Sequence, residues 1–180
     1  MTAKLVVPGE EYLYSYLEAC RDFKAYNGGQ YSLHDPDAFE EWRHTIFQQF
    51  ENQRLGIRLP DGYVPGSTFW LVEGGEFVGV GNIRHRLTEG LEKFGGHIGY
   101  MIRCDKWGQG YGTLQLRLLL AEAAALGIKR ALITCDESNI ASARVMEKNG
   151  AVYQDTIVNV IDGVPRRTKR YWAETPAAGL

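Results

Sequence analysis

The first third of the chain predicts a short strand followed by two helices. The strand is expected over 4–7, and apolar residues then recur three and four positions apart over 12–20, which is the spacing of one helix face. A second helix is predicted over 36–50, because Asp35 can cap it, Pro36 suits its first turn and aromatic residues follow along one side. Both apolar stripes are interpreted as core.

Between 55 and 67 the chain is rich in Gly and Pro, which indicates a loop. After this loop the pattern changes to apolar stretches of strand length that are separated by turns. Three successive antiparallel strands are the simplest interpretation, over 67–72, 77–87 and 97–103, and a polar loop over 88–95 joins the last two.

The rest of the chain mixes both periods. The predicted elements are a helix over 113–125, a buried strand over 130–135, a helix over 140–148, and a hairpin of 151–160 and 166–172 that turns at Asp162-Gly163. No internal repeat and no low-complexity tract interrupts this order. A single compact domain is therefore expected.

Composition and charge narrow the function. The chain has 180 residues, and its 20 Lys and Arg against 22 Asp and Glu give a formal net charge of −2, so nucleic acid is not expected as the main partner. Three widely spaced cysteines form no Cys-x-x-Cys pair and indicate reduced thiols in the cytoplasm. No long apolar run predicts secretion or a membrane span. No cluster of His, Cys or carboxylates has the spacing of metal ligands.

The most informative stretch lies between a predicted strand and a helix, and contains Gly108, Gly110 and Gly112. Glycines let backbone N–H groups converge, and the first N–H groups of a helix are free, so such a loop can bind phosphate oxygens. A Walker loop is disfavoured because the lysine is missing, and the glycine spacing does not fit a dinucleotide fingerprint. A tight connection that binds nothing remains an alternative.

This stretch resembles the Gln/Arg-x-x-Gly-x-Gly/Ala signature of the GNAT superfamily of acetyl-CoA-dependent N-acetyltransferases. Gly110 and Gly112 match the two glycines, whereas Trp107 stands at the Gln/Arg position. A second family motif, Asn-x-x-Ala/Ser in a helix that ends in Gly, is similar to 139–150. Within the superfamily the chain resembles bacterial predicted acetyltransferases of unassigned substrate, and the likeness is good from about 69 to 153.

The resemblance implies an α+β fold, a single GNAT-like domain over 1–180 with a mixed, mostly antiparallel sheet flanked by helices. Residues 1–66 would be the variable part on the substrate side, and 67–172 the acetyl-CoA-binding core. It also implies the residues that bind acetyl-CoA as cosubstrate. These are Tyr100, Met101 and Ile102 for the pantetheine arm, the loop of Trp107, Gly108, Gln109, Gly110, Tyr111, Gly112 and Thr113 for the diphosphate, and Asn139 and Ser142 for the pantetheine. Asn139 and Ser142 can alternatively serve only to cap their helix.

Acid and base candidates follow from the chemistry of amine acetylation. An amine must be neutral to attack, so a base is useful, and His97 is the best candidate because histidine titrates near neutrality. Asp136, at the end of a strand, is the second candidate. Each can instead be an ordinary strand or turn residue. Many family members protonate the departing thiolate with a tyrosine whose position here holds Met146, and the remaining donors are Tyr100, Tyr153 and Cys135.

Arg84 and Arg86 share one face of their predicted strand, and would favour an acidic acceptor if that face lines the cleft; a solvated face is the alternative. The expected function is direct transfer of an acetyl group from acetyl-CoA to a primary amine of a small molecule or peptide. A non-catalytic acyl-CoA-binding or sensory module is the alternative. The acceptor and the oligomeric state, including a homodimer, are left open.

Overall fold

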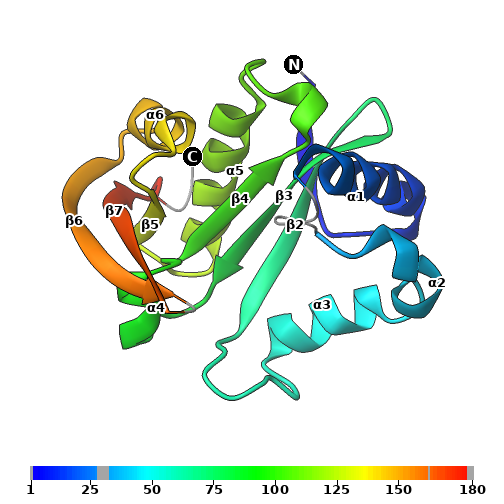
Figure 1. Cartoon of the computed structure of the whole chain (residues 1–180), viewed down its shortest axis with the longest axis horizontal. Coiled ribbons are helices and arrows are strands. Elements are labelled where there is room, and N and C mark those ends of the chain that lie inside the picture. The colour runs from blue at the N-terminus through cyan, green and yellow to red at the C-terminus, as the bar shows by residue number, and fades with distance from the viewer. Residues whose placement is uncertain (1, 28–32, 162, 178–180) are drawn as a thin grey trace.

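The computed structural model describes residues 2–27, 33–161 and 163–177, which form one seven-stranded sheet with helices on both faces (Figure 1). The strand order is β1-β2-β3-β4-β5-β7-β6, and all neighbours are antiparallel except β4 and β5. The expected α+β class with a mixed, mostly antiparallel sheet is confirmed. The strands are β1 (Lys4–Val6), β2 (Gly66–Glu73), β3 (Glu76–Arg84), β4 (Ile98–Ile102), β5 (Arg130–Asp136), β6 (Val152–Ile161) and β7 (Val164–Glu174).

The helices form two layers. One layer covers the face of β2 and β3 at the right of Figure 1, and the other covers the opposite face around β4 and β5. The first layer holds an aromatic core in which the ring of fully buried Trp70 stacks on Tyr16 with centroids 4.7 Å apart. The helices are α1 (Leu13–Asn27), α2 (Phe39–Trp42) and α3 (Ile46–Leu55) in that layer, α5 (Tyr111–Ala125) and α6 (Ile140–Lys148) in the other, and the short α4 (Glu89–Lys93) between β3 and β4.

Several predicted boundaries were wrong, including the end of the strand expected over 77–87, which lies at Arg84. The helix expected over 36–50 is broken, because the backbone N–H and the hydroxyl of Thr45 both donate to the Trp42 carbonyl and tighten the chain there. The loop expected over 88–95 contains α4, whose start is capped by the Thr88 hydroxyl accepting from the Leu91 N–H. Helix α5 begins at Tyr111 rather than Thr113. The predicted hairpin turn includes Asp162, which lies outside the described residues.

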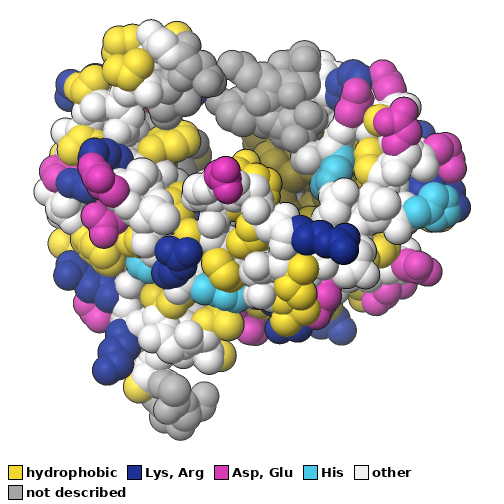
Figure 2. All heavy atoms as spheres, turned by 90° about the horizontal axis from the view of Figure 1, so that it is seen from below, with side chains coloured by type: hydrophobic (Ala, Val, Ile, Leu, Met, Phe, Trp, Pro, Cys, Tyr) yellow, Lys and Arg dark blue, Asp and Glu magenta, His cyan; other side chains and the backbone are white. Residues whose placement is uncertain are grey.

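The charges are mixed over the surface. In Figure 2, which views the molecule from below Figure 1, acidic side chains gather toward the end that carries α1 and α2, whereas Lys and Arg side chains are spread over the rest. Within the described part of the chain, no helix has the length and apolar character needed to cross a membrane.

Candidate active site

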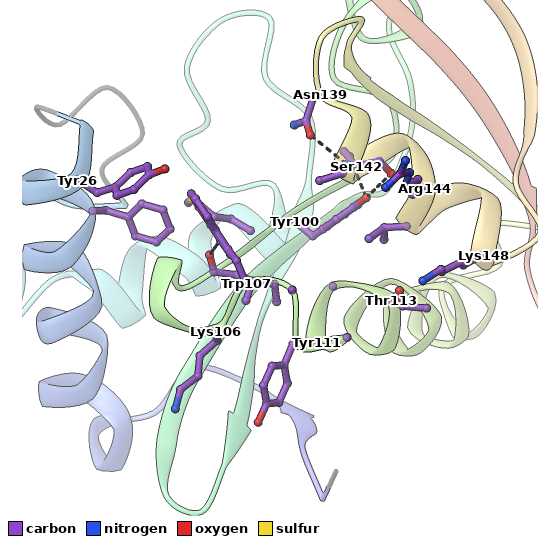
Figure 3. Close-up of a pocket in the computed structure, with 18 residues that line it drawn as sticks. Tyr26, Tyr100, Lys106, Trp107, Tyr111, Thr113, Asn139, Ser142, Arg144 and Lys148 are labelled. Atoms are coloured by element: carbon purple, nitrogen blue, oxygen red, sulfur yellow. Dashed lines mark hydrogen bonds between the residues drawn. The ribbon is translucent and has the colours of Figure 1, made fainter.

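A cavity of about 870 Å³ opens where β4 and β5 diverge (Figure 3). The two strands are paired only at Ile98 and Ile133, so that their carboxyl ends spread apart. The size suits a ligand larger than a simple metabolite. Its walls come from α1, β4, the loop before α5, the start of α5 and one side of α6 along its length. They consist of Phe23, Tyr26, Tyr100, Met101, Ile102, Lys106, Trp107, Gly108, Gly110, Tyr111, Gly112, Thr113, Asn139, Ala141, Ser142, Arg144, Val145 and Lys148.

The structure brings the expected cofactor residues together around this cavity, with one exception. Gln109 does not line the cavity, and its amide instead donates to the Asp105 carbonyl at 3.0 Å. The sequence interpretation missed four wall residues of α6, which are Ala141, Arg144, Val145 and Lys148. They follow Asn139 at helical spacing, and that spacing was a usable signal. Phe23 and Tyr26 come from α1, more than 70 residues away, and nothing in their own pattern distinguishes them from core residues.

The backbone of β4 has unpaired polar groups on the side of the cavity. Hydrogen bonds from the Arg84 N–H to the His97 carbonyl and from the Arg103 N–H to the Val78 carbonyl fix which residues of β4 bond to β3. By alternation, the backbone groups of Tyr100 and Ile102 turn away from β3 toward the gap left by β5. The Ile102 carbonyl accepts from the Trp107 indole, so the N–H and C=O of Tyr100 and the N–H of Ile102 remain for a ligand. An extended ligand chain can therefore pair with this edge as another strand would.

The glycine loop ends in a helix start with free N–H groups. Gly110 caps α5 with a φ of 90°, a conformation that glycine adopts without strain. The Leu114 N–H is bonded to the Gly110 carbonyl, and the N–H groups of Tyr111, Gly112 and Thr113 precede that first bond. The side chain of Tyr111 points away and donates to Glu73 (Figure 3). This terminus can hold phosphate oxygens.

Trp107 forms part of an aromatic wall opposite α6. Its indole N–H donates to the Ile102 carbonyl at 2.7 Å, which holds the ring at the end of β4. The ring of Tyr26 meets it edge-on with centroids 5.1 Å apart. Arg103 ties this wall to the loop, because its guanidinium bonds to Asp22 of α1 as well as to Asp105.

Tyr100 and Ser142 form a hydroxyl pair inside the cavity. Their oxygens are 2.9 Å apart, and the Asn139 side chain accepts from the Ser142 N–H at 3.0 Å, so that the start of α6 is fixed (Figure 3). Burial raises the pKa of Tyr100 to about 12. The pair is therefore protonated at neutral pH and presents hydroxyl donors inside the cavity.

The charged groups of the cavity wall are all cations. Arg144 and Lys148 lie one turn apart on α6, and neither forms an ion pair within the described ranges. Lys106 stands on the other flank, 3.8 Å from Glu76. No Asp, Glu, His or Cys is among the wall residues just named. A polyanionic ligand fits this wall.

A family model described as an acetyltransferase (GNAT) domain matches residues 10–152. The chain belongs to the GNAT family. It is an acyltransferase, and acetyl-CoA is the cosubstrate of GNAT enzymes. The family expected from the two sequence motifs is thus confirmed.

Solved GNAT structures share the whole fold. RimL, a ribosomal L7/L12 alpha-N-protein acetyltransferase in complex with coenzyme A, is 20% identical with a TM-score of 0.67 over 97% of this chain and 94% of that chain. An acetyltransferase from Salmonella typhimurium that modifies the N-terminal serine of L7/L12 is 20% identical with a TM-score of 0.69 over 98% and 96%. MccE, a microcin C7 self-immunity acetyltransferase in complex with acetyl-CoA and AMP, is 15% identical with a TM-score of 0.67 over 96% and 92%. No curated protein sequence matches the chain.

The two expected catalytic residues lie outside the cavity wall. The Leu132 N–H donates to Nδ1 of His97 at 3.0 Å, so the proton of the neutral ring is on Nε2. Burial, together with the charge of Arg84, lowers the pKa of His97. Asp136 accepts from the N–H and the hydroxyl of Ser138, which lowers the pKa of its carboxyl group and makes it a weak base.

The other two candidate proton donors, Tyr153 and Cys135, do not belong to the cavity wall. Met146, at the position of the usual GNAT tyrosine, is fully buried in the core between α5 and α6. Tyr153 is half exposed and bonds to Thr156, and burial raises the pKa of the Cys135 thiol to about 11. Among the described residues, no group of three or more His, Cys, Asp and Glu is arranged to hold a metal ion.

Arg84 and Arg86 do not share a surface. Arg84 ends β3, and its guanidinium donates to the carbonyls of Gly95 and Gly96, both at 3.1 Å. Arg86 lies two residues beyond the last residue of β3 and is exposed. Neither residue is part of the cavity wall.

Proposed function

We propose that the protein transfers an acetyl group from acetyl-CoA directly to a primary amine of a small molecule or peptide. The observation that carries this proposal is the cavity between β4 and β5, which combines unpaired backbone groups, a free helix start and a protonated hydroxyl pair. Acetyl-CoA, when bound, supplies the acetyl group as a thioester. The molecule is long, contains amides and carries several negative charges. These properties match a wall that is extended, offers backbone hydrogen bonds and carries cations.

Different residues of the cavity would hold different parts of acetyl-CoA. The N–H groups of Tyr111, Gly112 and Thr113 would hold the diphosphate at the start of α5, with Arg144 and Lys148 beside it. The N–H and C=O of Tyr100 and the N–H of Ile102 would pair with the pantetheine amides. Gln109 has no role in this assignment, because its side chain is directed to Asp105.

Proton transfer is assigned to the hydroxyl pair. Ser142 would donate a proton to the departing thiolate, Tyr100, bonded to it, would restore the serine proton, and water would return a proton to Tyr100 to balance the one that the amine releases. The hydrogen bonds of His97 and Asp136 favour positioning roles, so we assign removal of the amine proton to water. Since no His or carboxylate stands in the wall to activate Ser142, direct transfer is favoured over an acetyl-serine intermediate.

A non-catalytic acyl-CoA-binding module is the second candidate. It is favoured by Met146, which leaves the usual donor position without a proton, and by the lack of a base in the cavity wall. Both candidates require the same ligand, so binding alone does not separate them.

Two measurements test the proposal in sequence. Coenzyme A and acetyl-CoA should each raise the melting temperature of the protein, because a ligand that binds only the folded state stabilises it. Release of free thiol from acetyl-CoA should then accelerate with at least one member of a panel of amines. Binding without amine-dependent thiol release would support the module, and no stabilisation by either nucleotide would contradict both candidates.

The proposal keeps the division of the chain into 1–66 and 67–172 with one modification. Phe23 and Tyr26 of α1 belong to the first part but contribute to the cavity, so the variable part would help to hold the donor as well as the acceptor. We also propose a cytoplasmic location, which is supported by the three free cysteines, Cys20, Cys104 and Cys135.

A further inference from the structure

Arg84 differs from the other partly buried arginines of the described chain. Arg103, whose side chain is 11% exposed, is 3.1 Å from Asp22, and Arg170, at 18%, is 2.6 Å from Asp155. Arg43 pairs with Glu40. Arg84 alone of these four contacts no carboxylate, and its only partners within the described ranges are two backbone carbonyls. A cation removed from water is normally paired, so Arg84 lacks a counter-ion.

The guanidinium of Arg84 lies against two glycines. A Cβ atom at Gly95 would lie 3.6 Å from Cζ, and one at Gly99 would lie 3.9 Å from Nη1. Because both residues are glycines, neither places a side chain of its own against the guanidinium, and Cδ2 of Leu91 is the nearest apolar atom on the Gly95 side. Burial lowers the pKa of Arg84, and the hydroxyl of Tyr63 is the only titratable group that acts in the opposite direction. An anion brought to this place would relieve the desolvated charge.

A second hydrogen-bond donor stands beside Arg84. The Arg84 N–H donates to the His97 carbonyl, so the two residues stand opposite each other across the antiparallel pair of β3 and β4 and their side chains leave the sheet on the same face. The charge of Arg84 also contributes to the lowered pKa of His97. The Leu132 N–H occupies Nδ1 of His97, so Nε2 carries the proton and is a donor. No partner of Nε2 is found among the described residues. Besides the two bonds from Nη1 of Arg84, the pair therefore offers donors that have no acceptor among the described residues.

This pair lies on the path to the cavity. Gly99, against which the guanidinium lies, is two residues before Met101, so the two positions are about 7 Å apart along β4. Gly99 and Met101 turn the same way from β4, opposite to Tyr100. An acceptor that reaches the divergence of β4 and β5 from this face would have its far end at Arg84.

We propose that Arg84 and His97 bind an anionic group, a carboxylate or a phosphate, on the amine acceptor. The proposal rests on the proposed function, and it restricts the acceptor to amines that carry such a group near the nitrogen. Arg84 anchors the anion through the donors that the carbonyls of Gly95 and Gly96 leave free, and His97 donates from Nε2. Both are substrate-binding residues rather than proton carriers.

The binding test uses two small anions as probes, acetate for a carboxylate and inorganic phosphate for a phosphate. The protein is first saturated with coenzyme A, so that phosphate cannot report on the helix start of α5. The ring C–H signals of His97 are then followed by NMR. Either anion should shift them saturably and raise the pKa of His97, because the anion offsets the charge of Arg84. No saturable shift with either anion would overturn the proposal.

Three variants separate the charge of Arg84 from its structural role of donating hydrogen bonds to the Gly95 and Gly96 carbonyls. Arg84→Gln keeps amide donors for the two carbonyls but removes the charge, so it should abolish the shift without unfolding the loop. Arg84→Lys keeps the charge and should retain a weaker response. Arg86→Gln, which removes a neighbouring exposed cation, should behave like the wild type. A shift that survives in folded Arg84→Gln would contradict the assignment.

The activity test compares two matched pairs of acceptors. In one pair an amino acid is compared with its carboxamide, and in the other phosphoethanolamine is compared with ethanolamine. The anionic member should have a kcat/KM about 10- to 100-fold higher, and Arg84→Gln should remove that preference. Equal rates for both members of each pair would overturn the proposal while leaving acetyl transfer intact. Failure of coenzyme A to stabilise the protein would instead contradict the proposed function.

Discussion

The two ends of β4 present different chemistry to the space beside them. At its carboxyl end, around Tyr100 and Ile102, the available groups are mostly backbone N–H and C=O groups and the free start of α5. At its amino end, around His97 and Arg84, they are side chains. Backbone recognition needs only glycines and the right strand ends, whereas side-chain recognition depends on which residues stand there. Backbone recognition can therefore be kept while side chains change, whereas the acceptor specificity proposed for Arg84 and His97 would change with them.

The largest expected effect is at the carboxyl end. In Gly112→Val the new Cβ would lie 3.3 Å from Cγ2 of Val145 and 3.9 Å from Cγ1 of Ile102, at the mouth of the cavity. Coenzyme A binding should weaken by about 100-fold or more, which corresponds to about 2.8 kcal/mol. Calorimetry measures the affinity, and circular dichroism checks the fold.

Gly90→Ala is the matched control, because a Cβ there meets only the Thr88 hydroxyl at 3.9 Å. Its affinity should equal that of the wild type. Wild-type affinity in folded Gly112→Val would instead mean that the start of α5 does not hold the ligand.

A smaller loss is expected from the hydroxyl pair. Tyr100→Phe and Ser142→Ala should each lower kcat by about 10- to 100-fold with little change in affinity for coenzyme A, since a positioned acid contributes about that much or more. The double variant should be no slower than the slower single variant, because both residues serve one proton path.

The pH profile sharpens this prediction. With the pKa of Tyr100 raised to about 12, its ionisation should produce no alkaline fall in wild-type kcat below about pH 10. If the loss of kcat in the double variant equals the product of the two single losses, Tyr100 and Ser142 act separately.

The cations of α6 should matter less, because they are exposed. Arg144→Gln and Lys148→Gln should each weaken coenzyme A binding by up to about fivefold, or about 1 kcal/mol, and should reduce its salt dependence. Arg117→Gln, an exposed cation of α5 outside the cavity wall, is the control. A salt dependence unchanged in both α6 variants would place the phosphates elsewhere.

The smallest effect is expected on stability, from the titration of His97 at the amino end of β4. Because burial lowers the pKa of His97, the folded state favours the neutral ring. Its contribution to the free energy of unfolding is complete above the ordinary pKa of 6.5 and is lost as the pH falls from there through the lowered value.

Substitution of His97 should remove part of this acid sensitivity. In His97→Gln, where the amide oxygen can still accept from the Leu132 N–H, stability should fall less steeply below pH 6.5. Denaturant titrations at several pH values measure this, with exposed His44→Gln as the control. An unchanged slope in His97→Gln would mean that another group carries the effect.

The sequence predicted most of the fold because the apolar period changes clearly along the chain. Boundaries failed where one hydrogen bond decides them. The break after Trp42 depends on Thr45, and α4 depends on a threonine cap in a stretch too short for a periodic pattern. The sequence predicted that β3 and β4 are antiparallel neighbours. It did not predict that β4 diverges from β5, because that divergence depends on tertiary packing.

The site was predictable to the extent that it is local. The glycine loop and the start of α6 are continuous stretches, so their residues were found together. Tyr26 reaches the cavity from a distant helix, and no local pattern indicates that. His97 was chosen for its titration range, but the Leu132 N–H fixes its tautomer, and a long-range hydrogen bond of this kind leaves no trace in the sequence. Arg84 and Arg86 were grouped by strand alternation, which fails because β3 ends at Arg84.

The indole at the family's Gln/Arg position gives the protein a natural optical reporter. Trp107 is 48% exposed at the cavity, whereas Trp42 and Trp70 are 8% and 0% exposed in the aromatic core. Water around Trp107 should leave when a ligand fills the cavity, so its emission should move to shorter wavelength and acrylamide should quench it less. Donor binding can thus be followed by intrinsic fluorescence, without a label, and Trp107→Phe provides the blank.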